Sequence, residues 1–454
     1  MGADVAVVVQ AVARTAVRPV DGELAGWNPV ELAGAVGREA LERAGLGAGD
    51  LDEVVVGCAD PVGACGADAA RAIVLAAGWP VTVGGMVVDR GETSGLAAVQ
   101  AAMAAIRSGQ ARTVLVVGLG LCSVVPPGAA ALNRTYGAPW GGVAERFADA
   151  GGLLPAPRLT ERVALAAGID RAALDAAAEE SRRRRAEADT SPAIVAVAAR
   201  PGDAAGRGVY PGDPVAADVV RDWGDPAELP PTFDDEGLLT AATFAPPADA
   251  VAAVLLQAVE GRPESQSGGR PAETTTPLGP PAGVSTTSHQ AAGTESTSSF
   301  ADPAGEATAP DDASTAVTPS QGDRGSGEAW RPGRVLATVV GTGRAAGDPF
   351  DPVGDVAVAV DRALAEAGTG LDAVEDIAVV EHDASTAMLV AQALGVDAGR
   401  INRSGGAVAT GSTGAAEELR LITDGLTDPE ASRLLLTVSA GPTGSAVVVW
   451  RMDI

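Results

Sequence analysis

An internal repeat limits the possible folds of this chain more than any other feature of its sequence. Residues 39–60 and 362–383 share one pattern: a stretch rich in Ala and Leu that ends at Ala-Gly, an acidic segment, and an apolar run containing Val or Ile. A Gly after the last apolar position is a helix stop signal, and a short β-branched run between turn signals is typical of a buried strand. Each copy therefore predicts a helix, a turn and a strand.

Apolar runs on both sides of each copy extend the repeat. Runs at residues 5–9 and 335–340 precede the two copies, and runs at residues 113–117 and 434–438 follow them. Two β-α-β-α-β units in one chain predict an α/β protein with duplicated halves and mixed, mostly parallel sheets. A last apolar run, at residues 446–450, is expected to pair with 434–438 as a hairpin-like end of the second sheet.

Composition and charge exclude several functional classes. The 454 residues carry a net charge of −27, and Lys is absent, so every basic residue is Arg. Chemistry through a Schiff-base lysine is therefore excluded. Binding to nucleic acid or to an anionic membrane is not expected, because both need a basic face. No apolar run reaches the roughly 18 residues of a membrane span, and no signal peptide is recognised, so we expect a cytoplasmic protein.

The three cysteines, Cys58, Cys65 and Cys122, have neither the spacing of a metal site nor that of a disulfide framework. We expect all three to be small packing residues.

Changes in composition divide the chain. Residues 262–331 are rich in Ser, Thr, Pro, Gly and acidic residues with almost no large apolar side chain, so they are predicted to be a disordered linker without a function of its own. The first half is expected to comprise residues 1–118 plus 237–261, with residues 119–236 as an inserted loop domain. The second half is expected at residues 332–454.

A helix is predicted within this loop domain, at residues 171–188. It carries four consecutive arginines at positions 182–185. We interpret this run as a solvated helix face; the alternative is contact with the phosphates of a nucleotide-bearing ligand.

Several segments resemble the thiolase family in their order and spacing. Asp89 and Arg90 end an apolar run and are followed by Ser94 and Gly95, as in the turn that carries the family's reactive Cys. Further similar segments lie at 13–15, 43–46, 52–58, 78–83, 236–241 and 402–407. The resemblance covers nearly everything except the linker, and it implies a thiolase-like fold with a loop domain.

The resemblance also places the active-site positions of the family, and most of them are altered. Glu92 stands where the family has its nucleophilic Cys, Ser412 where it has the His base, and Ser439 where it has the second Cys. His382 resembles the His of the His-Asp turn in the sterol-carrier type of thiolase. Gly441 matches the glycine whose N–H, with the N–H at position 92, forms an oxyanion hole. No base is expected beside either serine, so neither hydroxyl should be an effective nucleophile.

These substitutions predict that the usual thiolase reaction is lost. The favoured hypothesis is a protein of acyl-CoA, lipid or polyketide-type metabolism that binds an acyl-CoA or acyl-carrier thioester, or a partner subunit. The resemblance implies a homodimer, or a heteromer with an active thiolase-type subunit. It implies a CoA thioester as ligand, with neither a tightly bound cofactor nor a metal.

Two alternatives stay open. One is an enzyme with altered acyl-thioester chemistry, a decarboxylase or an aldolase-type enzyme, in which Glu92 or His382 acts as a general base. The other is a conventional acyl-CoA acyltransferase whose catalytic groups come from elsewhere.

Overall fold

A computed structural model of the chain describes residues 5–132, 154–200, 212–260, 333–428 and 433–453, with isolated positions between them. The predicted linker at 262–331 lies outside the described residues except for Arg331, and so does part of the predicted loop domain.

The first half of the repeat forms the elements expected of it. Its elements are β1 (Val5–Arg14), β2 (Arg18–Pro19), α1 (Pro29–Ala44), β3 (Glu53–Gly57), α2 (Ala69–Ala76), β4 (Gly84–Val88), α3 (Ser94–Arg107), β5 (Thr113–Leu121) and β8 (Ala248–Glu260).

The second half repeats most of this order. Its elements are β9 (Ala337–Ala345), α8 (Val356–Ala367), β10 (Asp376–Val379), α9 (Ala384–Leu394), α10 (Ala407–Thr410), α11 (Ala415–Thr427), β11 (Leu434–Gly441) and β12 (Gly444–Met452). The short helix α10 stands where the first half has the strand β4. The helices α1 and α8, which come from the two repeat copies, both end at a glycine in the left-handed conformation, Gly45 and Gly368. A glycine adopts this backbone at little cost, which explains the shared Ala-Gly signal.

The described part of the predicted loop domain is mainly helical. It contains α4 (Ala129–Leu132), α6 (Ala156–Ala166), α7 (Arg171–Glu187) and the short strands β6 (Val197–Ala198) and β7 (Pro214–Val215). The helix expected at 171–188 is confirmed as α7, and Asp170 caps it by accepting a hydrogen bond from the N–H of Ala173.

One mixed sheet joins the two halves in the order β10-β11-β12-β9-β1-β8-β5-β3-β4, with β2 beside β8. The strands β3, β4 and β5 pair in parallel, as do β10 and β11, and the expected hairpin of β11 with β12 is confirmed. The sheet contains both parallel and antiparallel pairs, as expected. Antiparallel pairs form the larger share, however, because the strands from β11 through β5 all pair antiparallel with their neighbours. The cause is that β8 and β12 return beside β1 and β9 to close each half.

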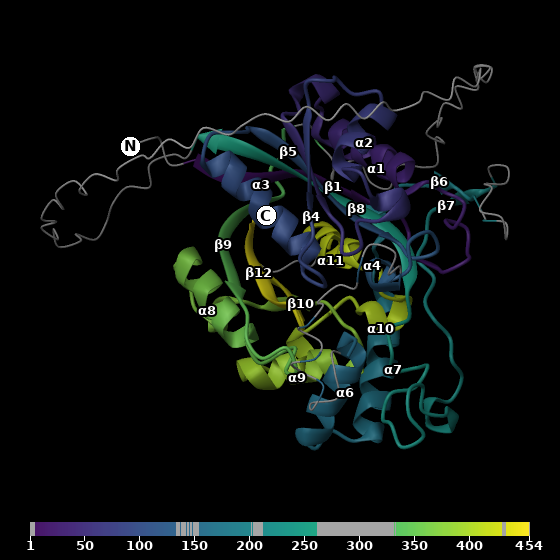
Figure 1. Cartoon of the computed structure of the whole chain (residues 1–454). Coiled ribbons are helices and arrows are strands. Elements are labelled where there is room, and N and C mark those ends of the chain that lie inside the picture. The colour runs from purple at the N-terminus through teal and green to yellow at the C-terminus, as the bar shows by residue number, and fades with distance from the viewer. Residues whose placement is uncertain are drawn as a thin grey trace, which may run out of the picture. The chain divides into compact units, whose positions relative to one another are not determined.

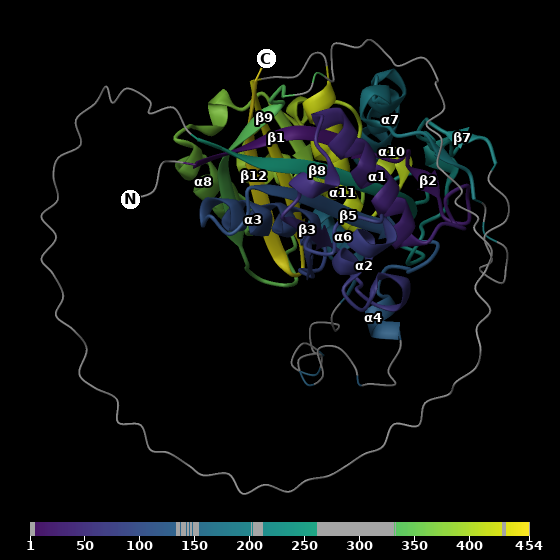
Figure 2. The same ribbon diagram turned by 90° about the horizontal axis from the view of Figure 1, so that it is seen from above.

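The helices form layers on both faces of this sheet. The helices α3 and α11 pack between the strands of the two halves, α1 and α2 cover the outer face of the first half, and α8 and α9 cover the outer face of the second (Figures 1 and 2). Alternate residues of β5 illustrate the arrangement: Val114 and Val116 face α3 and α11, and Leu115 and Val117 face α1 and α2. The α/β class with duplicated halves is thus confirmed.

A buried ionic cluster connects the described part of the loop domain to both halves of the sheet. Arg14 of β1 and Arg185 of α7 each bind both Asp218 and Asp424, and Arg420 of α11 also binds Asp424. Each of these side chains is at most 5% exposed. Glu417, which also binds Arg420, adds a third negative charge, so three positive and three negative charges compensate one another where water is excluded.

Candidate active site

The turn between β4 and α3 positions Glu92. The carboxylate of Asp89 accepts a hydrogen bond from the N–H of Gly91, and the hydroxyl of Ser94 accepts one from the N–H of Arg90 and donates one to the carbonyl of Gly91. Gly91 has a φ of +54°, which a glycine tolerates best. This tight turn places Glu92 directly before the first turn of α3.

The side chain of Glu92 lies against the loop that joins β11 to β12. The hydroxyl of Thr443 lies 3.2 Å from Oε2 of Glu92 and donates to it, and the same hydroxyl lies 3.0 Å from the carbonyl oxygen of Arg90. A Cβ atom added to Gly441 would lie 3.0–3.1 Å from Cβ, Cγ and Oε2 of Glu92. The carboxylate therefore fills the space beside Gly441.

Ser439 of β11 contacts the backbone of Glu92. Its hydroxyl donates a 2.9 Å hydrogen bond to the backbone carbonyl of Glu92. Glu418 on α11 is completely buried; one of its oxygens accepts a hydrogen bond from the N–H of Gly95 at the start of α3, and the other has no hydrogen-bond partner among the described residues. Burial raises the pKa of Glu418 to about 8, since the charged form loses its hydration.

The buried carboxyl group of Glu418 at the start of α3 was not foreseen, because its position on α11, far along the chain from α3, left no pattern in the sequence that could have indicated it. Thr443 was also not foreseen as a neighbour of Glu92, although it lies only two residues after Gly441.

The imidazole ring of His382 is hydrogen-bonded to the backbone of Ala440, the residue before Gly441. Its Nε2 lies 2.8 Å from the carbonyl oxygen of Ala440, so Nε2 carries the proton, and Nδ1 is left as the acceptor in the neutral ring. Asp383, the next residue, begins α9 by accepting a hydrogen bond from the N–H of Ser385, and Thr160 of α6 also donates to it.

Ser412 lies beside the segment that leads into β8. Its N–H donates to the carbonyl of Pro246 at 2.7 Å, and its carbonyl accepts from the N–H of Ala248 at 2.8 Å. Within the described residues, none of its hydrogen bonds reaches Glu92, Ser439 or His382. The structure therefore brings Glu92, Ser439 and Gly441 together with His382 close by, whereas Ser412 is held by a separate set of contacts. Catalytic roles for these residues stay predictions.

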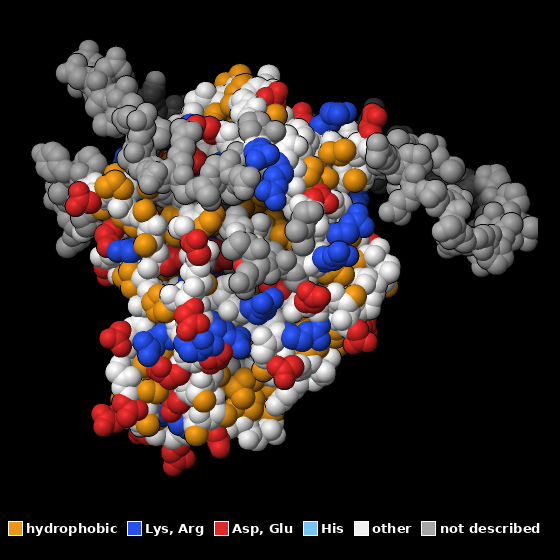
Figure 3. Space-filling view, turned by 180° about the vertical axis from the view of Figure 1, so that it is seen from behind, with side chains coloured by type: hydrophobic (Ala, Val, Ile, Leu, Met, Phe, Trp, Pro, Cys, Tyr) orange, Lys and Arg blue, Asp and Glu red, His pale blue; other side chains and the backbone are white. Residues whose placement is uncertain are grey.

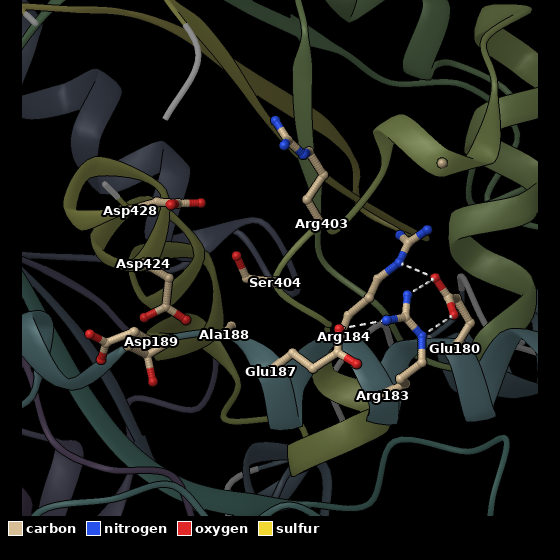
Figure 4. A pocket seen from close by; sticks show the side chains of 12 residues that line it. Glu180, Arg183, Arg184, Glu187, Ala188, Asp189, Arg403, Ser404, Asp424 and Asp428 are labelled. Carbon is tan, nitrogen blue, oxygen red and sulfur yellow. Dashed lines mark hydrogen bonds and ion pairs between the residues drawn. The ribbon is translucent and has the colours of Figure 1, made fainter. Parts of the chain in front are cut away.

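A polar groove of about 450 Å³ runs along α7, away from these residues (Figure 4). Glu180 binds both Arg183 and Arg184 there, and Arg184 also donates to the carbonyl of Ile401. These contacts fit the predicted solvated face for the exposed part of the arginine run, and they add ion pairs that were not predicted. For Arg185 that prediction is wrong, because this residue belongs to the buried ionic cluster.

The charges on the surface are mixed. On the face seen in Figure 3, Arg and acidic side chains lie among one another across the described surface, without a large field of a single sign. In the described ranges, no helix is long and apolar enough to cross a membrane. Among these same residues, no three His, Cys, Asp or Glu side chains gather in a way that could hold a metal ion.

Comparison with protein families agrees with this geometry. The thiolase N-terminal domain matches residues 6–260, and the thiolase C-terminal domain matches residues 333–451. The chain belongs to the thiolase family. The two matched domains contain the two repeated halves of the sheet, and neither includes any of the predicted linker at 262–331.

Individual thiolase-family relatives support this assignment. An acetyl-CoA acetyltransferase of Pseudomonas aeruginosa is 29% identical over 433 residues, which cover 92% of this chain and 91% of that protein. The steroid 3-ketoacyl-CoA thiolase FadA6 of Mycobacterium tuberculosis is 38% identical over 121 residues, 27% of this chain and 30% of that protein. An acetyl-CoA acetyltransferase of Escherichia coli is 36% identical over 120 residues, 26% of this chain and 30% of that protein. The chain is thus similar to an acetyl-CoA acetyltransferase over most of its length, and to the other two proteins over about a quarter of it.

Proposed function

We propose that this protein binds an acyl-CoA or acyl-carrier thioester on its thiolase scaffold and does not carry out the usual thiolase reaction. The observation that supports this most is the side chain of Glu92, which fills the space beside Gly441 and is hydrogen-bonded to Thr443. A carboxylate is a poor acceptor of an acyl group from a thioester, because the anhydride that would form is less stable than the thioester.

The groups around Glu92 are poorly placed to act as a base, which favours binding of a thioester over acyl transfer. His382 donates through Nε2 to a backbone carbonyl, and the backbone hydrogen bonds of Ser412 go to Pro246 and Ala248 at the entry to β8. The buried Glu418, which accepts from the N–H of Gly95, has a pKa of about 8, so near neutral pH it is mostly protonated and is a poor general base.

Calorimetric titration of the full chain with acetyl-CoA tests the binding. We expect saturable binding to the wild-type chain, and retained binding to Glu92→Gln, which has nearly the same size without the charge. The absence of binding to wild type, Glu92→Gln and Glu92→Ala alike would sink the proposal that the scaffold takes a thioester.

A second candidate function is altered chemistry at Glu92, favoured by its position next to Gly441. Its clearest form is decarboxylation of malonyl-CoA, which would yield acetyl-CoA and carbon dioxide. Mass spectrometry of malonyl-CoA incubated with the protein tests it. Formation of acetyl-CoA that disappears in Glu92→Ala would support a decarboxylase, and its absence in wild type would exclude this reaction.

The edge of the sheet supports the expected pairing with a second thiolase-type subunit. Among the described strands, β4 pairs only with β3, so one side of its backbone is unpaired. Exposed apolar side chains lie beside it: Val81 is 71% exposed, Leu75 54% and Met86 37%. An unpaired edge with apolar neighbours favours pairing with another chain. Light scattering of wild type and Met86→Glu tests this. If the wild-type chain is a monomer, a homodimer is excluded and only a heteromer with another subunit remains possible.

A further inference from the structure

The carboxylate of Glu92 has one oxygen engaged within the protein and one oxygen available to a ligand. Its Oε2 lies on the side of Gly441 and accepts a hydrogen bond from the hydroxyl of Thr443 at 3.2 Å. Its Oε1 accepts no hydrogen bond from any residue that the structure describes. The side chain is only partly buried, and Oε1 is not among the polar atoms that are shut off from water without a partner. Solvent, or a molecule that replaces it, therefore reaches Oε1.

No positive charge in the described part of the chain neutralises this carboxylate. Arg90, two residues earlier, turns its guanidinium group toward the other half of the sheet, where Nη2 donates to the carbonyl of Ala345 at 3.4 Å. None of the described arginines forms an ion pair with Glu92, whereas Glu366 and Glu417 each bind an arginine. A carboxylate without a cation beside it attracts a ligand that brings the positive charge.

The side-chain donors around Glu92 are already used within the protein. Ser439 donates to the backbone carbonyl of Glu92, and Thr443 donates to the turn that carries it. His382 donates through Nε2 to the carbonyl of Ala440. The positions left over are acceptors, Oε1 of Glu92 and Nδ1 of the neutral imidazole ring. Acceptors together with a negative charge fit a group that is both a donor and a cation, and a primary ammonium group is both.

We propose that Glu92 selects thioesters whose acyl group carries a primary amine on its α or β carbon. This rests on the proposed function, because it requires a thioester to bind beside Gly441. The N–H groups of Glu92 and Gly441 are the expected donors to the thioester carbonyl. Since that N–H and the carboxylate belong to the same residue, an ammonium group that reaches Oε1 lies only a few bonds from the carbonyl. An α- or β-aminoacyl group has this spacing.

The same carboxylate disfavours other acyl groups. An acyl group that ends in a carboxylate would bring two negative charges together at Glu92, which repel each other most strongly where water is partly excluded. An uncharged acyl chain would displace water from Oε1 without replacing its hydrogen bond. Glu92 is thus a specificity-determining residue whose charge both attracts one class of thioester and rejects another.

Calorimetric titration of the full-length chain with three CoA thioesters tests this. β-Alanyl-CoA, butyryl-CoA and succinyl-CoA share the CoA portion and have acyl chains of similar length. At pH 7 their acyl chains end in an ammonium group, a methyl group and a carboxylate, respectively. We expect the wild-type chain to bind β-alanyl-CoA at least about tenfold more tightly than butyryl-CoA, because the ammonium group adds a hydrogen bond between charged partners. Succinyl-CoA should bind most weakly.

Two variants assign the preference to one carboxylate. Glu92→Gln keeps the size of the side chain and removes its charge, so it should bind the three thioesters with similar affinity. Glu187→Gln removes a carboxylate on α7 that is 64% exposed, and it should keep the wild-type order. Equal affinities of wild type for β-alanyl-CoA and butyryl-CoA would overturn this inference alone, as would a preference that survives in Glu92→Gln. No binding of any of the three thioesters would overturn the proposed function as well.

Discussion

At the scale of single residues, the contacts of Glu92 determine what can occupy the space beside Gly441. The hydroxyl of Thr443 contacts both the carbonyl of Arg90 and the carboxylate of Glu92. The hydroxyl of Ser439 donates to the backbone carbonyl of Glu92. The resemblance to thiolases located Glu92, Ser439 and Gly441 in the sequence. It could not locate Thr443 or Glu418, because their contacts depend on how distant segments pack.

Buried carboxyls give the protein a stability that depends on pH. Burial raises the pKa of Glu418 to about 8, that of Glu381 to about 7 and that of Asp249 to about 6, above the ordinary value near 4. The folded state therefore binds more protons than the unfolded chain, so this stabilisation is complete below about pH 4 and is lost as the pH rises through these values. We expect the free energy of unfolding to fall between about pH 5 and pH 8.

Glu418→Gln should flatten this fall, because the amide cannot titrate and can still accept from the N–H of Gly95. The removed slope is up to about 1.4 kcal/mol per pH unit. Urea denaturation across the pH range measures it. Glu180→Gln is the control: a hydrogen bond from Arg183 lowers the pKa of Glu180 to about 2, below the window. Equal slopes for wild type and Glu418→Gln would contradict this assignment.

At the scale of elements, β5 and α11 approach each other through glycines. A Cβ at Gly118 would lie 2.4 Å from the carbonyl oxygen of Ala415, and one at Gly120 would lie 1.7 Å from that of Thr413. The strand was expected from the apolar run at 113–117, but its close approach to α11 could not be predicted, since an apolar run does not indicate which helix will cross it.

Gly120→Ala should therefore destabilise the fold, because its methyl group overlaps backbone atoms that cannot move independently. We expect a loss of about 1–3 kcal/mol or more in urea denaturation. Gly49→Ala is the matched control, since a Cβ there meets nothing within 4 Å. Similar stabilities for the two variants would show that α11 is not packed this closely on β5.

The helix α7 presents two arginines in different environments. Arg185→Ala leaves Asp218 with only Arg14 and Asp424 with Arg14 and Arg420, and it should cost about 3–5 kcal/mol in the free energy of unfolding. Arg183→Ala, on the exposed side of the same helix, should have little effect. Thermal unfolding of both variants distinguishes them. Equal effects would mean that the ionic cluster does not hold α7 in place. The sequence predicted the helix, but not that one arginine of the run turns inward.

At the scale of the whole molecule, the duplication was readable from the sequence because both copies carry the same helix stop and strand signals. The sheet order was not, since apolar runs do not state which strands become neighbours. The runs at 113–117 and 434–438 were placed correctly, but the antiparallel return of β8 and β12 beside β1 and β9 changed the balance of pairing. Family membership follows from the complete architecture, whereas the reaction depends on a few side chains beside Gly441.

The measurement that tests the account most directly is a mass-spectrometric time course of the purified full-length chain with acetoacetyl-CoA and CoA. The account predicts no acetyl-CoA above a protein-free control, even at concentrations at which the thioester binds. Formation of acetyl-CoA in proportion to the amount of protein would contradict it, and would mean that a nucleophile other than the side chain at position 92 supports the thiolase reaction.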